Sequence, residues 1–97
     1  MRPYRLTPAA EDDLFNIWSH IASENLVAAD ALESELLQTC QRLANRPDLG
    51  HWRREWTDKP VRFFTVHENY LVVYDPVAEP LEVLRVLHWA RDVAVEL

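Results

Sequence analysis

The chain has 97 residues, and its 48% hydrophobic content with only one glycine excludes a disordered or low-complexity protein. One cysteine excludes an internal disulfide, and no stretch is apolar enough for a signal peptide or long enough to span a bilayer. We therefore expect a single cytoplasmic domain, residues 1–97, with no membrane contact. The net charge of −6 disfavours a nucleic-acid-binding protein.

Positive charge is concentrated in residues 42–62, just before the predicted sheet. Six of the ten basic residues lie in this stretch with only three of the sixteen acidic residues. The basic residues are Arg42, Arg46, Arg53, Arg54, Lys59 and Arg62. The remainder of the chain is acidic, so this stretch is the only net-positive region of the sequence.

The N-terminal half predicts a short strand followed by two helices. Apolar and polar residues alternate over Tyr4–Thr7, and Thr7 before Pro8 is typical of a helix N-cap with proline at the first helical position. We expect this helix to end near residues 23–25. A second helix then runs until Asn45-Arg-Pro47, and the short connection implies an antiparallel helical hairpin.

Each predicted helix has one apolar stripe that the sheet must cover. In the first helix the stripe comprises Ala10, Leu14, Ile17, Trp18 and Ile21. In the second it comprises Ala28, Ala31, Leu32, Leu36, Cys40, Leu43 and Ala44. We interpret Cys40 as a small core residue, since free cysteine is usually buried.

The connection to the sheet contains two tryptophans interleaved with two arginines, Trp52, Arg53, Arg54 and Trp56. This composition is enriched at the centres of protein interfaces, so these four residues are candidate partner contacts. Equally, either tryptophan could fold over the edge of the core with the arginines solvated around it.

Residues 61–87 predict a three-stranded antiparallel meander. Three runs rich in Val, Phe, Tyr and Leu are separated by His67-Glu-Asn69 and by Asp75-Pro-Val-Ala-Glu-Pro80. The last strand ends in the charged segment His88-Trp-Ala-Arg-Asp92. Functional groups often stand at such strand ends, although they can also cap the next turn.

Arg62, Arg85, His88 and Arg91 are the candidate site residues of the sheet. If the helices cover one face, we expect Arg62 and Arg85 on the other, wetter face, where they could bind a phosphate or a carboxylate. His88 could act as a general acid or base. Alternatively, Arg85 and Arg91 pair with Glu82 and Asp92 while His88 closes the turn, and we favour this structural interpretation over catalysis.

No metal site or cofactor is expected. The four histidines have no metal-ligand spacing, and one glycine cannot form a phosphate-binding loop.

Six motifs in this order resemble the RelE/ParE superfamily of type II toxin–antitoxin toxins. They are Tyr4-Arg-Leu-Thr-Pro-Ala-Ala10, Glu11-Asp-Asp-Leu14, Pro47-x-x-Gly50, Val61-Arg-Phe63, Tyr70-Leu-Val-Val-Tyr74 and Val83-Leu-Arg-Val-Leu-His-Trp-Ala-Arg-Asp92. The resemblance covers nearly the whole chain, and the closing motif is similar to ParE-like members. It implies an α+β fold: a short strand, a helical hairpin on an antiparallel sheet of three to four strands, and a short C-terminal segment.

The superfamily carries two activities. RelE-like members are ribosome-dependent endoribonucleases, while ParE-like members bind and poison DNA gyrase. Matched to the ribonuclease branch, this chain has Phe64 and Leu71 where that branch has a lysine and an arginine. The other lysine falls on Arg62, a further arginine falls near Trp89, and residues 93–97 contain no counterpart of the C-terminal tyrosine.

A ribonuclease mechanism would therefore rest on Arg62, His88 and Arg91, without the usual acid and base. The resemblance favours a non-enzymatic ParE-like toxin that inhibits gyrase and is neutralised by a cognate antitoxin. The alternatives are a ribosome-dependent messenger RNA endoribonuclease and a non-toxic member that only binds its antitoxin. The antitoxin is expected to wrap the helical hairpin and lie along the sheet.

Overall fold

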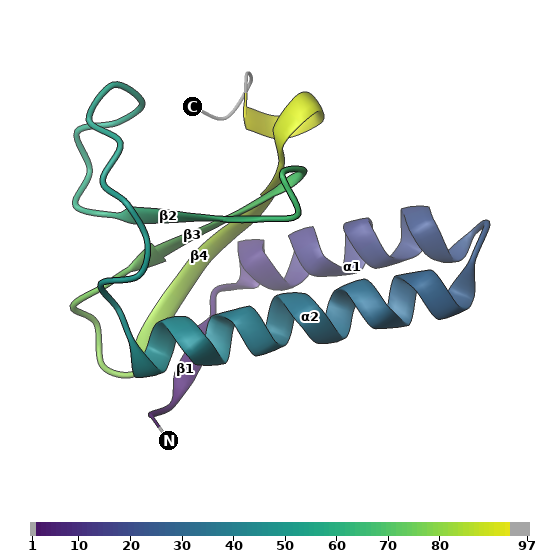
Figure 1. The fold of residues 1–97 in the computed structure, drawn as a ribbon, viewed down its shortest axis with the longest axis horizontal. Coiled ribbons are helices and arrows are strands. Elements are labelled where there is room, and N and C mark those ends of the chain that lie inside the picture. Colours follow the sequence, from purple (N-terminus) through teal and green to yellow (C-terminus); the bar gives the residue numbers. More distant parts are fainter. Residues whose placement is uncertain (1, 94–97) are drawn as a thin grey trace.

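The computed structural model describes residues 2–93. Met1 and residues 94–97 lie outside that range, so most of the segment that lacks a counterpart of the ribonuclease tyrosine is not described. The elements are β1 (Tyr4–Leu6), α1 (Pro8–Ala22), α2 (Leu26–Asn45), β2 (Arg62–Val66), β3 (Tyr70–Asp75), β4 (Leu81–His88) and the π-helical turn η1 (Trp89–Val93). Figure 1 shows α1 and α2 side by side along one face of the sheet. The predicted α+β fold is confirmed.

Local signals set the ends of both helices. The Thr7 side chain accepts a hydrogen bond from the first turn of α1, with Pro8 as the first helical residue, as predicted. Asn25 caps α2 in the same way. α2 ends at Asn45, ahead of Pro47, because the residue before a proline disfavours helical geometry.

The sheet has the order β1-β4-β3-β2. The meander β2-β3-β4 is antiparallel as predicted, whereas β1 pairs with β4 in parallel, so the complete sheet is mixed. Alternation along β1 predicts a strand but does not encode the direction of its partner. In the β2–β3 turn, His67 and Glu68 have positive φ angles of 55° and 63°, a left-handed conformation that is costly for residues with a Cβ.

The main core lies between the helices and the sheet. Its buried residues are Ala10, Leu14, Ile17, Leu36, Cys40, Leu43, Ala44, Val66, Val72, Tyr74, Leu81, Val83 and Val86. Ala28 and Ala31, which we expected in the stripe of α2, are exposed, and Ala29 is buried instead. At about 100° per residue, Ala29 lies only about 20° from Leu36 around the helix, whereas Ala28 lies about 80° and Ala31 about 140° away, so only Ala29 shares the inner face.

A second apolar cluster covers the opposite face of the sheet. It comprises Val61, Phe63, Leu71, Val73 and Leu87, with Trp56, Leu84 and Trp89 packed against them. The chain between α2 and β2 rises onto this side of the sheet, away from the helices (Figure 1). The prediction of a wet second face was therefore wrong, because the tryptophan-containing connection shields it from water.

Within residues 2–93, neither helix combines the length and the apolar character that crossing a membrane requires.

Candidate functional site

Arg62 lies where β2 begins and is held by backbone carbonyl groups. Its guanidinium donates to Gly50 O at 2.7 Å and to Asp48 O at 3.4 Å. Arg62 pairs in register with Tyr74, a residue of the helix-facing core, so it lies on that face and not on the opposite face as expected. The reason is that Phe63, the next residue, takes the inward position of the second apolar cluster.

The Trp–Arg segment, residues 51–62, stacks its arginines on indole rings. Trp52 is 40% exposed, with the guanidinium carbon of Arg62 at 4.6 Å and that of Arg54 at 5.1 Å from its ring centroid. Arg53 lies 5.2 Å from the ring centroid of Trp56. Stacking orients a guanidinium while leaving its N–H groups free to bind oxygen acceptors.

The two tryptophans have different roles, which resolves the alternative left open by the sequence. Trp52 is exposed beside its arginines. Trp56 instead makes edge-to-face contacts with Phe63 at 5.1 Å and with Trp89 at 5.0 Å, inside the second apolar cluster. Trp52 therefore lies at the surface together with the two arginines stacked on its ring, whereas Trp56 packs into the second apolar cluster and carries Arg53 on its ring.

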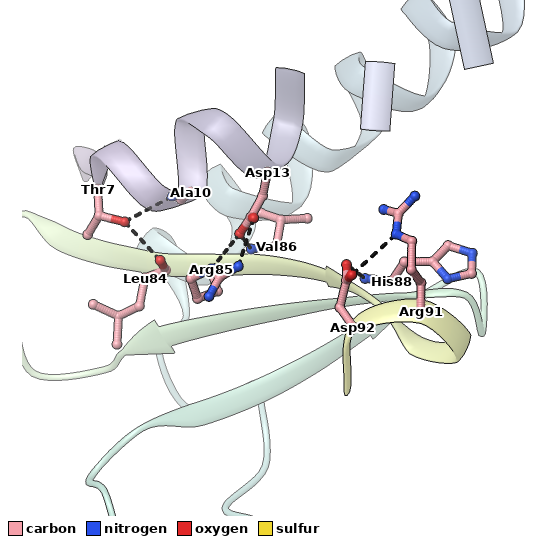
Figure 2. Close-up of polar contacts among 9 residues, drawn as sticks. All are labelled: Thr7, Ala10, Asp13, Leu84, Arg85, Val86, His88, Arg91 and Asp92. Carbon is pink, nitrogen blue, oxygen red and sulfur yellow. Dashed lines mark hydrogen bonds and ion pairs between the residues drawn. The ribbon is translucent and has the colours of Figure 1, made fainter. Parts of the chain in front are cut away.

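The outer edge of β4 is closed by side chains from α1. The register of β3 and β4 shifts between Val73 and Tyr74, which leaves Leu84 as an extra residue in β4. Thr7 donates its hydroxyl to the carbonyl of Leu84 at 2.8 Å, and Asp13 accepts from the amide of Val86 at 2.9 Å (Figure 2). These side chains replace the missing neighbouring strand where β1 ends.

Arg85 forms a two-point ion pair with Asp13, also drawn in Figure 2. Arg85 Nε donates to Asp13 Oδ2 at 2.7 Å and Arg85 Nη2 donates to Asp13 Oδ1 at 3.0 Å. The alternative pairing of Arg85 with Glu82 was wrong. Glu82 pairs with Arg5 across β1 and β4. Arg85 lies opposite Val73 of the second apolar cluster in the register, and its guanidinium reaches Asp13 of α1 from there.

His88 and Arg91 meet at Asp92, where β4 passes into η1 (Figure 2). Asp92 accepts from the backbone amide of His88 at 2.9 Å and from Arg91 Nε at 3.2 Å, which confirms the Arg91–Asp92 pair. Burial raises the pKa of Asp92, but these hydrogen bonds and the nearby positive charge outweigh it and hold the pKa below the ordinary value of an aspartate. The His88 ring contacts Tyr70 edge-to-face, and its buried Nδ1 has no hydrogen-bond partner among the described residues.

The four candidate residues of the sheet therefore form two separate sites. Along β3, Arg62 lies opposite Tyr74 and His88 lies opposite Tyr70. Four residues of strand separate these positions by about 13 Å. The Arg62 guanidinium also turns towards Gly50 and Trp52, so it does not converge with His88 and Arg91 on one phosphate.

Sequence reasoning missed the roles of Asp13 and Gly50. Asp13 entered the sequence analysis only as part of the Glu11-Asp-Asp-Leu14 motif, and its contact with β4 spans 72 residues of sequence. Gly50 belongs to the Pro47-x-x-Gly50 motif, and its amide donates to Tyr74 Oη at 2.8 Å while that hydroxyl donates to Pro47 O at 2.7 Å. The motif could have indicated a tightly fitted turn, but not its tyrosine partner.

Together, the fold and these two sites define a small α+β protein that presents an arginine–tryptophan surface. The edge of its strand β4 beyond β1 is covered by hydrogen bonds from the side chains of Thr7 and Asp13. The sequence matches the family model described as the ParE toxin of the parDE type II toxin–antitoxin system over residues 4–93. The chain belongs to this family of toxins.

A solved structure agrees with this assignment at the level of the fold. The chain is similar to a chain of the chromosomal ParDE toxin–antitoxin system from P. aeruginosa, with a TM-score of 0.73 and 19% sequence identity. The match covers 91% of this chain and 96% of the other. A comparison with curated proteins gave no match.

Proposed function

We propose that this toxin arrests growth in the cytoplasm by binding DNA gyrase, and that a cognate antitoxin protein neutralises it. The observation that carries the proposal is the match of residues 4–93 to the ParE toxin family. The proposed action is binding without catalysis.

The geometry of the sheet supports a non-enzymatic action. Cleavage of RNA without a metal requires an acid, a base and positive charge around one scissile phosphate. Arg62 is about 13 Å along the sheet from the register position of His88, and its guanidinium is held by Gly50. Arg91 is engaged by Asp92. Phe64 and Leu71 contribute no ionisable group.

Two surfaces are proposed for partner binding. The first surface is formed by Trp52, Arg53, Arg54 and Arg62. Trp56 contributes indirectly, because Arg53 stacks on its ring. The other comprises Arg85, His88 and Arg91 at the end of β4. The first is the better candidate for antitoxin contact because its guanidinium groups stack on indole rings and form no ion pair with an acidic side chain of residues 2–93.

A supercoiling assay with purified gyrase tests the target. Relaxed plasmid, ATP and gyrase are incubated with increasing toxin, and loss of supercoiling or accumulation of cleaved plasmid is expected. Toxin premixed with its antitoxin serves as the control and should restore supercoiling. Undiminished supercoiling at a large excess of folded toxin would remove gyrase as the target, and messenger RNA cut in a parallel ribosome reaction would establish the ribonuclease activity instead.

A further inference from the structure

A cleft lies on the second face of the sheet, between the Trp–Arg segment and β4. Its volume is about 550 Å³, within the usual range for ligand-binding pockets. The floor is apolar, formed chiefly by Phe63, Val73, Leu84 and Leu87, and Trp56 forms one wall. A cleft of this size and composition accommodates one or two aliphatic side chains.

The rim of the cleft is positively charged. Lys59 and Arg85 line it, and Arg53, which does not line the cleft itself, has its guanidinium carbon 5.2 Å from the ring centroid of the lining residue Trp56. No acidic side chain is among the described residues that line it. Because Asp13 already offsets the charge of Arg85, the attraction for an anion comes mainly from Lys59 and Arg53.

These two cations differ from the structural arginines of the protein. Arg5, Arg85 and Arg91 each form an ion pair with a carboxylate. Within residues 2–93, Lys59 and Arg53 form no ion pair. Their attraction for an external carboxylate is therefore not offset by a carboxylate within residues 2–93.

The wall of the cleft is fixed before any partner arrives. Trp56 is held between Phe63 and Trp89 by edge-to-face contacts, and the start of the segment is tied to β2 by two backbone hydrogen bonds between His51 and Phe63. A preformed wall lowers the ordering cost of binding. The shape and charge of the cleft are thus built into the free toxin.

We propose that this cleft is the docking site for a segment of the antitoxin in which an aliphatic side chain is flanked by aspartate or glutamate. The inference rests on the antitoxin part of the proposed function and is independent of gyrase. The aliphatic side chain enters the apolar floor, and the flanking carboxylates meet Lys59 and Arg53 at the rim. A nucleic acid fits less well, because the rings of Trp52 and Trp56 are engaged by arginines and the whole protein carries a charge of −6.

Fluorescence polarisation with synthetic probes tests the proposal on the full-length chain. The probes are a labelled peptide of alternating leucine and glutamate, a matched peptide of leucine and glutamine, and an oligothymidylate of equal length. We expect the leucine–glutamate peptide to bind at least about tenfold more tightly than either comparison probe, with an affinity that falls as salt is raised.

The variant Arg53→Glu/Lys59→Glu should weaken binding of the leucine–glutamate peptide at least about tenfold. The control Arg2→Glu/Arg42→Glu makes the same change in net charge away from the cleft and should leave binding unchanged. Leu84→Trp, which narrows the floor, should weaken both peptides. Circular dichroism confirms that each variant is folded.

Equal losses in the two charge-reversal variants would overturn the proposal, since they would report net charge alone. Tighter binding of oligothymidylate would assign the surface to a nucleic acid. Neither outcome alters the supercoiling result, so failure of this inference is distinguishable from failure of the gyrase proposal.

Discussion

Replacement of Asp13 by alanine should destabilise the protein more than its surface position on α1 suggests. The Asp13 carboxylate accepts three hydrogen bonds, two from Arg85 and one from the amide of Val86. Val86 is 1% exposed, so its amide has little access to replacement water. Asp13→Ala therefore removes both the hydrogen-bond acceptor of the Val86 amide in β4 and the carboxylate partner of Arg85.

The expected loss follows from these contacts. A buried amide left without an acceptor costs about 1–3 kcal/mol. The Arg85 side chain is 33% exposed and can be partly rehydrated, so loss of its partner adds about 1 kcal/mol, well below the cost for a fully buried pair. The free energy of unfolding should fall by about 2–4 kcal/mol, which lowers the Tm of a domain this size by about 10–25 °C.

Chemical denaturation followed by circular dichroism measures this loss. Asp12→Ala is the matched control, because Asp12 is exposed, lies in the same turn of α1 and changes the charge equally. The control should lose less than about 1 kcal/mol, mainly through the helix dipole. A double-mutant cycle with Arg85→Ala should give a coupling energy above about 1 kcal/mol. Equal losses in the free energy of unfolding for Asp12→Ala and Asp13→Ala would refute the stabilising role given to the contacts of Asp13 with Arg85 and Val86.

Three further predictions concern single residues. In Gly50→Ala the new Cβ would lie 2.5 Å from Tyr74 Oη and 3.0 Å from Phe63 O, so thermal melts should show a loss of about 2–4 kcal/mol from overpacking and disrupted hydrogen bonding. The pKa of Asp92 is lowered in the folded protein, so ionised Asp92 stabilises the fold fully above the ordinary carboxyl pKa. This stabilisation is lost as the pH falls through the pKa of Asp92 in the folded protein. Tm should therefore drop less steeply between about pH 5 and pH 2 in Asp92→Asn than in the parent. Burial raises the pKa of the Cys40 thiol to about 12, so a maleimide reagent at neutral pH should modify Cys40 only after denaturant unfolds the protein, and rapid labelling of the native protein would contradict its burial.

The parts of the fold that local rules control could be predicted from the sequence. Thr7 and Pro8 set the start of α1, Pro47 lies just beyond the end of α2, and the turn formers separate the strands of the meander. Each of these signals acts within a few residues of chain. The register of a strand depends on tertiary contacts, and a shift of one residue exchanges its two faces, which is why Arg62 was placed on the wrong face.

The candidate site could be predicted only in its composition. Clustered arginine and tryptophan indicated a binding surface, but the sequence did not distinguish exposed Trp52 from Trp56 in the second cluster. That difference depends on Trp89, which is 33 positions from Trp56 in the chain and contacts its ring at 5.0 Å. Likewise, Arg85 pairs with Asp13, which is 72 positions away in the chain, and no local pattern encodes that contact.

The protein places its guanidinium groups in two distinct ways, and this difference separates structure from recognition. At the edge of β4, Arg85 and Arg91 are joined to carboxylates, so most of their electrostatic attraction is used within the fold. In the Trp–Arg segment, Arg53 and Arg54 are stacked on indole rings, which orients their planes without neutralising their charge. An oriented cation that has no carboxylate partner gains most from an external anion, because the partner's carboxylate pairs with it without first breaking an existing ion pair. In an otherwise acidic toxin, recognition of an acidic partner is therefore expected at the Trp–Arg segment rather than at Arg85 and Arg91, which are paired with carboxylates.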